Sequence, residues 1–279
     1  MADVPGTVSQ ILWHFTGGPA WNEEENRQNI APKPAADAYD ALLSILSDRV
    51  ILLGGYKEVV KVRFQKLRIW DQKAKEYKVK RNVMRTLKSA PVCCLADIPI
   101  MHLSYHASRY GRFAIGFHRD AALRAGFNPV FYTLHDSDII RNIRKGFTKI
   151  RSVDLDYSRT LIDDIESADE DIDADGNLSA LRSEADELEV AITTAKESIA
   201  QFLAFIKTFD TNEFQSVYCE REWRSVTQFS FEYSDVAMIV LPKAVSKSRY
   251  FEPFVKTVAK RLGVPASVPA VPWETLLES

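Results

Sequence analysis

The stretch CCLADIPIMHLSYHASRYGRFAIGF, residues 93–117, places an apolar run, a proline turn, a segment rich in His and Tyr, and an alternating run in one order. Pro99 suits the first turn of a helix, which we expect from Ile100 to Arg109. The alternation in RFAIGF predicts a strand directly after it. Gly111 permits a close backbone approach, either to a ligand or within a plain helix that leads into a core strand.

Segments on both sides of this stretch also have β-like patterns. QILWHFTGG predicts a short strand, Ile11 to Phe15, which the paired glycines end. A helix follows, with its apolar residues at helical spacing (Ala41, Leu42, Ile45 and Leu46). Late in the chain, FQSVYCEREWRSVTQFSF and DVAMIVLP are again β-like, and a helix with Gly263 at its end comes last. We therefore predict an α+β fold with a mixed, mostly antiparallel sheet as its core.

Residues 136–210 differ from both flanks because their apolar residues keep a three-four spacing typical of helices. The longer stripe is a sustained heptad pattern: Leu178, Leu181, Ala185, Leu188, Ile192, Ala195, Ile199, Phe202, Ile206 and Phe209. The acidic run DEDIDADGN before it contains a turn signal. The pattern predicts a long helical hairpin inserted at 136–210 into a single α+β domain that spans 1–279. Its stripe packs against itself, against the core, or against a second copy in a homodimer.

Composition restricts the class of protein and its partners. The chain has 279 residues, 46% of them apolar and 27% charged, without an apolar run long enough to cross a membrane or a signal-like start. Three cysteines, two of them adjacent, do not form a disulfide framework. We expect a cytoplasmic protein with no membrane partner.

The net charge of −2 conceals two strongly charged segments. Residues 57–88 hold twelve Lys or Arg and three acids, a net charge of +9, whereas residues 154–189 hold fourteen acids and two arginines, a net charge of −12. Such asymmetry indicates a charged partner, an anionic ligand, segments that face each other, or simply two solvated faces.

Metal and nucleotide motifs are incomplete or absent. Asp171, Asp173, Asp175 and Gly176 match the start of a calcium loop, but Arg182 stands where the bidentate Glu is required. His102 and His106 share a helical face without a third zinc ligand, so we expect no metal. The phosphate-binding glycine motifs and the G-x-S-x-G nucleophile elbow do not occur.

Polar residues within the β-like runs are the remaining site candidates. In extended chain, His14 and Thr16 share a face, as do Tyr110 and Arg112. Glu220, Glu222 and Arg224 share another. Two acids on one strand face repel each other, and either a function or a basic partner at a solvent edge explains why they are there.

The central stretch resembles the phage-resistance family AbiGi, whose pattern is a Cys/Asp-Ile-Pro segment, then His, then Tyr-Gly and an alternating strand. HFT near the N-terminus and the late EREWR are similar to the same family. The resemblance covers residues 9–20, 91–132 and 215–242, and it implies a role in abortive infection, within a toxin–antitoxin pair.

The order of the three motifs is also similar to that of ADP-ribosyltransferases, including DarT-type enzymes, although their Ser-Thr-Ser is missing here. This likeness implies an ADP-ribosyltransferase-like sheet and NAD as the cofactor. Glu222 or Glu220 would stabilise the cationic ribose, and His14 and Thr16 would hold the cofactor. Tyr110 would stack on nicotinamide, and Arg112 or a lysine of the basic segment would bind pyrophosphate. The acceptor would be nucleic acid or protein, with phosphates held by the basic segment (Arg63, Lys66, Arg68, Lys78, Lys80 and Arg81).

The alternative is a non-enzymatic antitoxin or interaction protein. Its acidic hairpin would bind a basic partner, such as a cognate toxin, and the heptad stripe would set dimerisation. Nucleic-acid binding without catalysis is a third hypothesis.

Overall fold

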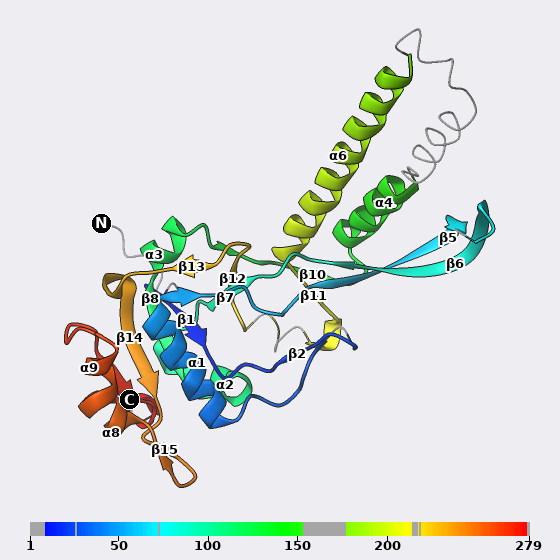
Figure 1. The fold of residues 1–279 in the computed structure, drawn as a ribbon. Helices are drawn as coiled ribbons and strands as arrows, with labels where there is room; N and C mark the ends of the chain where they lie inside the picture. The colour runs from blue at the N-terminus through cyan, green and yellow to red at the C-terminus, as the bar shows by residue number, and fades with distance from the viewer. Residues whose placement is uncertain are drawn as a thin grey trace, which may run out of the picture. The chain divides into compact units, whose positions relative to one another are not determined.

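The structure, a computed structural model, describes residues 9–25, 27–71, 73–152, 177–213, 217 and 219–277. The chain divides into two compact units (Figure 1). The first comprises residues 1–57, 91–132 and 204–279, and the second comprises 58–90 and 133–203. The single-domain organisation over 1–279 stays a prediction.

A seven-stranded sheet forms the centre of the first unit. Its order is β17-β14-β8-β1-β7-β12-β9. The bounds are Ala270–Pro272, Val236–Leu241, Ala114–His118, Ile11–Phe15, Cys93–Ala96, Glu222–Ser225 and Asn128–Pro129 in that order. All neighbours pair antiparallel except β14 and β17, which confirms the mixed, mostly antiparallel sheet.

Alternation along β1 sends side chains to opposite faces of this sheet. Leu12 packs in one buried cluster with Ile115 and Phe117 of β8. Trp13 packs in a second cluster with Ala96 of β7, and its indole N–H donates to the Ile98 carbonyl at 2.9 Å. Both faces are therefore covered, as an α+β layer arrangement requires.

Helices cover the sheet where the sequence predicts them. α1 (Ala35–Asp48) buries Ala38, Leu42 and Leu46, and it ends at Arg49 in the left-handed conformation. The Ile100–His102 turn η1 leads into α2 (Leu103–Tyr110), which confirms the helix expected after Pro99. The remaining helical segments of this unit are α3 (Arg119–Arg124), η3 (Thr211–Glu213), η4 (Tyr233–Asp235), α8 (Phe251–Pro253), η5 (Phe254–Val258), α9 (Ala259–Arg261) and η6 (Trp273–Leu277).

Short strands complete this unit. They pair as β2 (Trp21–Asn22) with β3 (Arg27–Gln28), β4 (Val50–Ile51) with β13 (Phe229–Ser230), and β15 (Ala244–Val245) with β16 (Ser248–Arg249). β10 (Phe131–Leu134) begins where this unit ends.

The described part of the second unit contains a long two-stranded ribbon and two helices. β5 (Val59–Asp71) pairs antiparallel with β6 (Glu76–Lys88). α4 (Asp138–Ser152) packs on β5, where Phe64 and Phe147 meet edge to face with centroids 6.4 Å apart. α6 (Asn177–Ala204) is a helix of 28 residues.

α6 ends earlier than the predicted stripe suggested, and the helical hairpin at 136–210 stays a prediction. Ile206 and Phe209 belong to β11 (Ile206–Phe209), whose four residues are all buried. A strand buried on both faces has no polar alternation, so its apolar residues continued the helical spacing by coincidence. In α6, Leu188 and Phe202 are 41% and 58% exposed, so the described stripe is only partly buried. The turn, including the Asp171–Asp175 acids, lies outside the described residues.

Among the described residues, no helix is long and apolar enough to cross a membrane.

Candidate functional site

A cavity of about 690 Å³ opens in the first unit, where β1, β7, α2 and the start of β12 meet. His14, Thr16, Tyr110, Glu220 and Glu222 all line it. A volume of this size is typical of sites for small molecules and cofactors. The fold therefore brings five of the sequence-predicted residues to one place.

Strand pairing explains how the N-terminal HFT segment and the late EREWR segment come together. Trp13 of β1 and Glu222 of β12 both pair with Ala96 of β7, which lies between them. His14 follows Trp13 on β1, and its Nδ1 atom lies 3.0 Å from the Cys94 carbonyl oxygen. Because a carbonyl only accepts, Nδ1 carries the proton and Nε2 is an acceptor. Burial lowers the pKa of His14, which keeps the ring neutral near pH 7.

Tyr110, from the central stretch at 93–117, reaches the cavity from the end of a helix rather than from a strand. Tyr110 is the last residue of α2, and β8 begins only at Ala114. The expectation that Tyr110 and Arg112 share a strand face is therefore wrong, because Gly111 turns the chain with φ +79°. A Cβ on Gly17 would lie 2.7 Å from the Tyr110 carbonyl oxygen, so these glycines serve contact between two chain segments.

Aromatic rings and a second histidine surround Tyr110. His106 stacks on Tyr110 with centroids 4.3 Å apart, and Phe15 packs on His106 at 4.9 Å. Burial raises the pKa of Tyr110, and the neighbouring Glu220 charge adds to the shift, so the hydroxyl stays protonated. That hydroxyl donates to Glu220 Oε1 at 3.3 Å.

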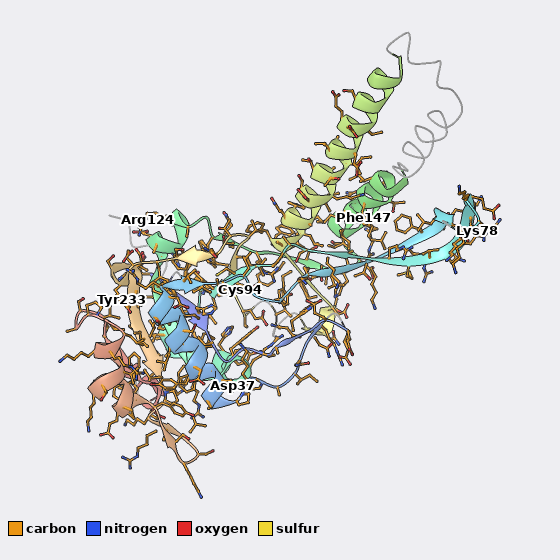
Figure 2. The ribbon with its side chains drawn as sticks, in the orientation of Figure 1. Asp37, Lys78, Cys94, Arg124, Phe147 and Tyr233 are labelled. Carbon is orange, nitrogen blue, oxygen red and sulfur yellow. The ribbon has the colours of Figure 1, made fainter. Side chains whose placement is uncertain are left out.

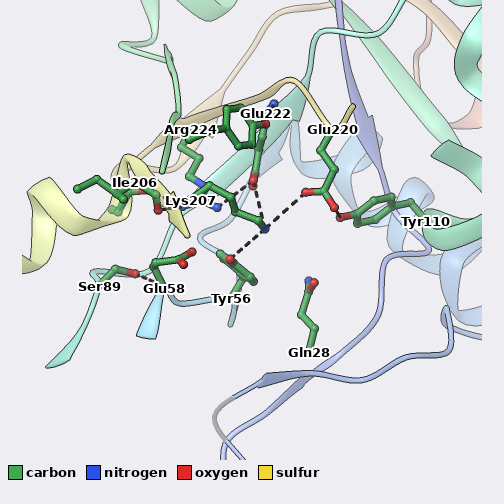
Figure 3. Close-up of polar contacts among 12 residues, drawn as sticks. Gln28, Tyr56, Glu58, Ser89, Tyr110, Ile206, Lys207, Glu220, Glu222 and Arg224 are labelled. Carbon is green, nitrogen blue, oxygen red and sulfur yellow. Dashed lines mark hydrogen bonds and ion pairs between the residues drawn. The ribbon is translucent and has the colours of Figure 1, made fainter. Parts of the chain in front are cut away.

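Lys207 of β11 joins the two glutamates. Its Nζ atom lies 3.5 Å from Glu220 Oε2 and 3.6 Å from Glu222 Oε2, and it donates to the Tyr56 hydroxyl at 3.0 Å (Figure 3). The side chains of all three charged residues are about one-tenth exposed or less. Lys207 also lies over the Tyr56 ring, 4.5 Å from its centroid.

Two arginines complete the network. Arg224, fully buried, donates to Glu222 Oε2 at 2.8 Å and to the carbonyls of Ala204 and Ile206. Arg109, at the exposed edge, donates to Glu220 Oε1 at 2.6 Å. The alternative that a basic residue, either Arg224 or one of the basic segment, pairs with the acids holds for Arg224 and Glu222, but this pair lies in the interior rather than at a solvent edge.

The network fixes the charge of each member. Burial by itself would raise the pKa of Glu222, but the charges of Arg224 and Lys207 and the hydrogen bond from Arg224 outweigh it and hold that pKa well below its usual range. Burial likewise opposes the charge of Lys207, but Tyr56 and the two glutamates raise its pKa overall. Glu222 and Lys207 are therefore both ionised near neutral pH.

The acids do not share a strand face as the sequence suggested. β12 begins at Glu222, and Arg221 has φ 42°, so Glu220 lies before the strand on a turn. The Glu222 backbone N–H donates to the Tyr132 hydroxyl at 2.8 Å and fixes the strand entrance. The two carboxylates converge through Lys207 rather than through strand alternation.

The other predicted residues lie elsewhere or are already bonded. The Thr16 hydroxyl donates to the Ala38 carbonyl at 2.6 Å, and Arg112 is not among the cavity's lining residues. The basic residues predicted to hold phosphate lie on the ribbon of the second unit (Arg63, Lys66, Arg68, Lys78, Lys80 and Arg81). Among the described residues, no group of three or more His, Cys, Asp or Glu could hold a metal ion.

The sequence analysis missed Lys207, Arg109 and Tyr56. A lysine between apolar neighbours in FIKTF was the available signal, since lysine is seldom buried unless it is paired. The helical spacing assigned to that run concealed it.

Comparison with known proteins identifies the family. The family model described as "Putative abortive phage resistance protein AbiGi, antitoxin" matches residues 65–254, well over half of the chain. The chain belongs to the AbiGi family. Membership confirms the resemblance of the central stretch and indicates a role in abortive phage resistance. No curated protein and no solved structure matches the AbiGi chain, so its likeness to ADP-ribosyltransferases gains no support from these comparisons.

Replacing Lys207 by methionine should destabilise the protein by about 3–5 kcal/mol, because two buried carboxylates then lose their shared cation. Urea denaturation measures the change. Lys256→Met removes an ammonium that is 71% exposed and should have little effect. Adding Glu220→Gln to Lys207→Met should restore part of the loss. Equal midpoints for both lysine variants would refute the structural role of the network.

Acid should weaken the fold through His106. Burial lowers its pKa from 6.5 to about 4, so between these values the unfolded chain binds a proton that the folded chain does not. Stability is complete above pH 6.5 and falls by about 3 kcal/mol as pH drops to 4. His106→Phe should flatten this slope in denaturation curves at several pH values. His118→Phe, at an exposed position, is the control. An unchanged slope in His106→Phe would contradict the burial of a neutral ring.

Proposed function

We propose that the chain is a phage-defence protein whose cavity binds NAD and transfers its ADP-ribose group to a nucleic acid or a protein. The observation that supports this is the meeting of His14, Tyr110 and the two glutamates in one cavity, although they come from three distant segments. Family membership supports the defence role, and the geometry supports the presence of a site.

The residues suit the chemistry of a glycosidic bond. Transfer breaks the bond between nicotinamide and ribose, nicotinamide leaves with the electron pair, and a nucleophile of the acceptor bonds to the ribose carbon and gives up its proton. The ribose becomes cationic on the way, as in glycoside hydrolysis. An ionised Glu222 beside the ribose would stabilise that charge and accept from a ribose hydroxyl.

Other lining groups would orient the dinucleotide. The Nε2 atom of His14 is an acceptor for a hydroxyl or amide, and the Tyr110 ring offers a stacking surface. Lys33, which lines the cavity, replaces Arg112 as the candidate for the pyrophosphate. The buried indole N–H of Trp21, another lining residue, has no hydrogen-bond partner in the described structure and could donate to a ligand.

Glu222→Gln should abolish transfer of label from NAD to protein or nucleic acid in a cell lysate, because it removes the charge that faces the ribose. His14→Asn tests the same cavity without disturbing the ion pairs, and it should weaken NAD binding measured by calorimetry. Glu252→Gln, on the surface, is the matched control. Circular dichroism verifies folding. Full transfer by a folded Glu222→Gln protein would end this assignment.

A second candidate is a non-enzymatic antitoxin that binds a cognate toxin, since the family description includes the word antitoxin. In that case, a protein encoded beside this chain should co-purify with it, and a Glu220→Gln/Glu222→Gln double variant should retain the partner. Co-purification without NAD binding would favour the antitoxin. NAD-dependent labelling that the double variant loses would favour the transferase.

A further inference from the structure

The ribbon formed by β5 and β6 lies within residues 57–88, which hold twelve Lys or Arg and three acids. Each strand has 13 residues, and the register runs from Val59 opposite Lys88 to Asp71 opposite Glu76. At 3.4 Å per residue, the ribbon is about 40 Å long. Figure 1 shows it as two long paired strands, and Figure 2 shows Lys78 near the end formed by the turn.

Side chains of the ribbon are buried mainly at the end away from its turn. Val60, Val62 and Phe64 are buried, and Phe64 meets Phe147 of α4. Between Leu67 and its partner Lys80, which includes the turn, every residue whose burial is described is exposed or half-exposed. Among the ribbon residues whose exposure is described, the exposed cations are Lys61, Arg63, Lys66, Lys73, Lys75, Lys78, Lys80, Arg81 and Arg85.

The few acids of the ribbon do not neutralise it. Asp71 accepts from the backbone N–H groups of Lys73 and Ala74 and from Lys78 Nζ at 2.7 Å, so it closes the turn. Glu76 lies 3.8 Å from the same lysine. Lys66, Lys80 and Arg81 have no carboxylate partner among the described residues. Within the described structure, no carboxylate therefore neutralises these three cations.

The register places like charges opposite each other. Lys66 pairs directly with Arg81 on one face of the ribbon, and Lys80, opposite Leu67 at the next position, lies on the other face. Like charges facing across a sheet are destabilising, and a bound polyanion removes that cost. Residues on one face recur about every 6.8 Å, twice the axial spacing of about 3.4 Å between phosphates along one strand of a duplex.

We infer that the β5–β6 ribbon binds B-form DNA, with its cations on the phosphates and its two strands in the major groove. A two-stranded ribbon fits that groove, which is about 12 Å wide, and isolated β-ribbons are an established way of entering it. The deep, narrow major groove of A-form RNA does not admit such a ribbon. The inference concerns binding alone and does not depend on the proposed transfer reaction.

The test is equilibrium binding of the full chain, without NAD, to a 20-base-pair DNA duplex of arbitrary sequence at several salt concentrations. The triple variant Lys66→Gln/Lys80→Gln/Arg81→Gln should bind at least tenfold more weakly at low salt. Its slope of log affinity against log salt should be shallower by about 2.7, since each phosphate contact contributes about 0.9.

The β15–β16 hairpin supplies a matched control. Lys243→Gln/Lys247→Gln/Arg249→Gln removes the same charge from another exposed two-stranded hairpin, and it should leave affinity and slope close to wild type. Duplex RNA of the same sequence should bind more weakly than DNA. Equal loss in both triple variants, equal affinity for duplex RNA, or no salt-dependent DNA binding would overturn the inference.

Discussion

Two carboxylates, those of Glu220 and Glu222, lie buried beside each other in the first unit, and Lys207 lies between them as their shared cation. Isolated, each would cost several kcal/mol to bury, and together they would repel. Lys207 bridges both at about 3.5 Å, and Arg224 and Arg109 each hold one. The network also holds distant segments together. Lys207 comes from β11 and Arg109 from α2, whereas Glu220 precedes β12 and Glu222 and Arg224 belong to it.

The same constraint connects the fold with the proposed chemistry. A cavity lined by an ionised Glu222, a neutral His14 and a protonated Tyr110 presents several fixed dipoles and charges to a ligand without reorganisation. Structural ion-pair networks perturb pKa values as well, so the charge pattern alone does not distinguish catalysis from stability. The cavity is a candidate site because of its volume and because residues from three distant segments line it, and family membership adds the context of phage defence.

The sequence predicted the elements better than their junctions. β1 from Ile11 to Phe15, the helix after Pro99 and the antiparallel sheet follow from alternation, proline placement and helical spacing, which are local signals. Tyr110 and Glu220 were assigned to strands although they lie on a helix end and a turn, because the positive φ angles of Gly111 and Arg221 leave little trace in apolar patterning. Lys207 was hidden because a fully buried strand shows no alternation. Its partners, Glu220 and Glu222, follow it by 13 and 15 residues and meet it only through the fold.

The most direct test of this account is a carbon-13 titration of the glutamate carboxyl groups, with the Glu222 signal assigned by its loss in Glu222→Gln. An ordinary glutamate with a pKa of 4.5 is mostly protonated at pH 4. The account predicts that Glu222 stays fully ionised from pH 8 to pH 4 while exposed glutamates titrate. A Glu222 signal that titrates at or above pH 4.5 would show that Lys207 and Arg224 do not hold it, and the central network would be wrong.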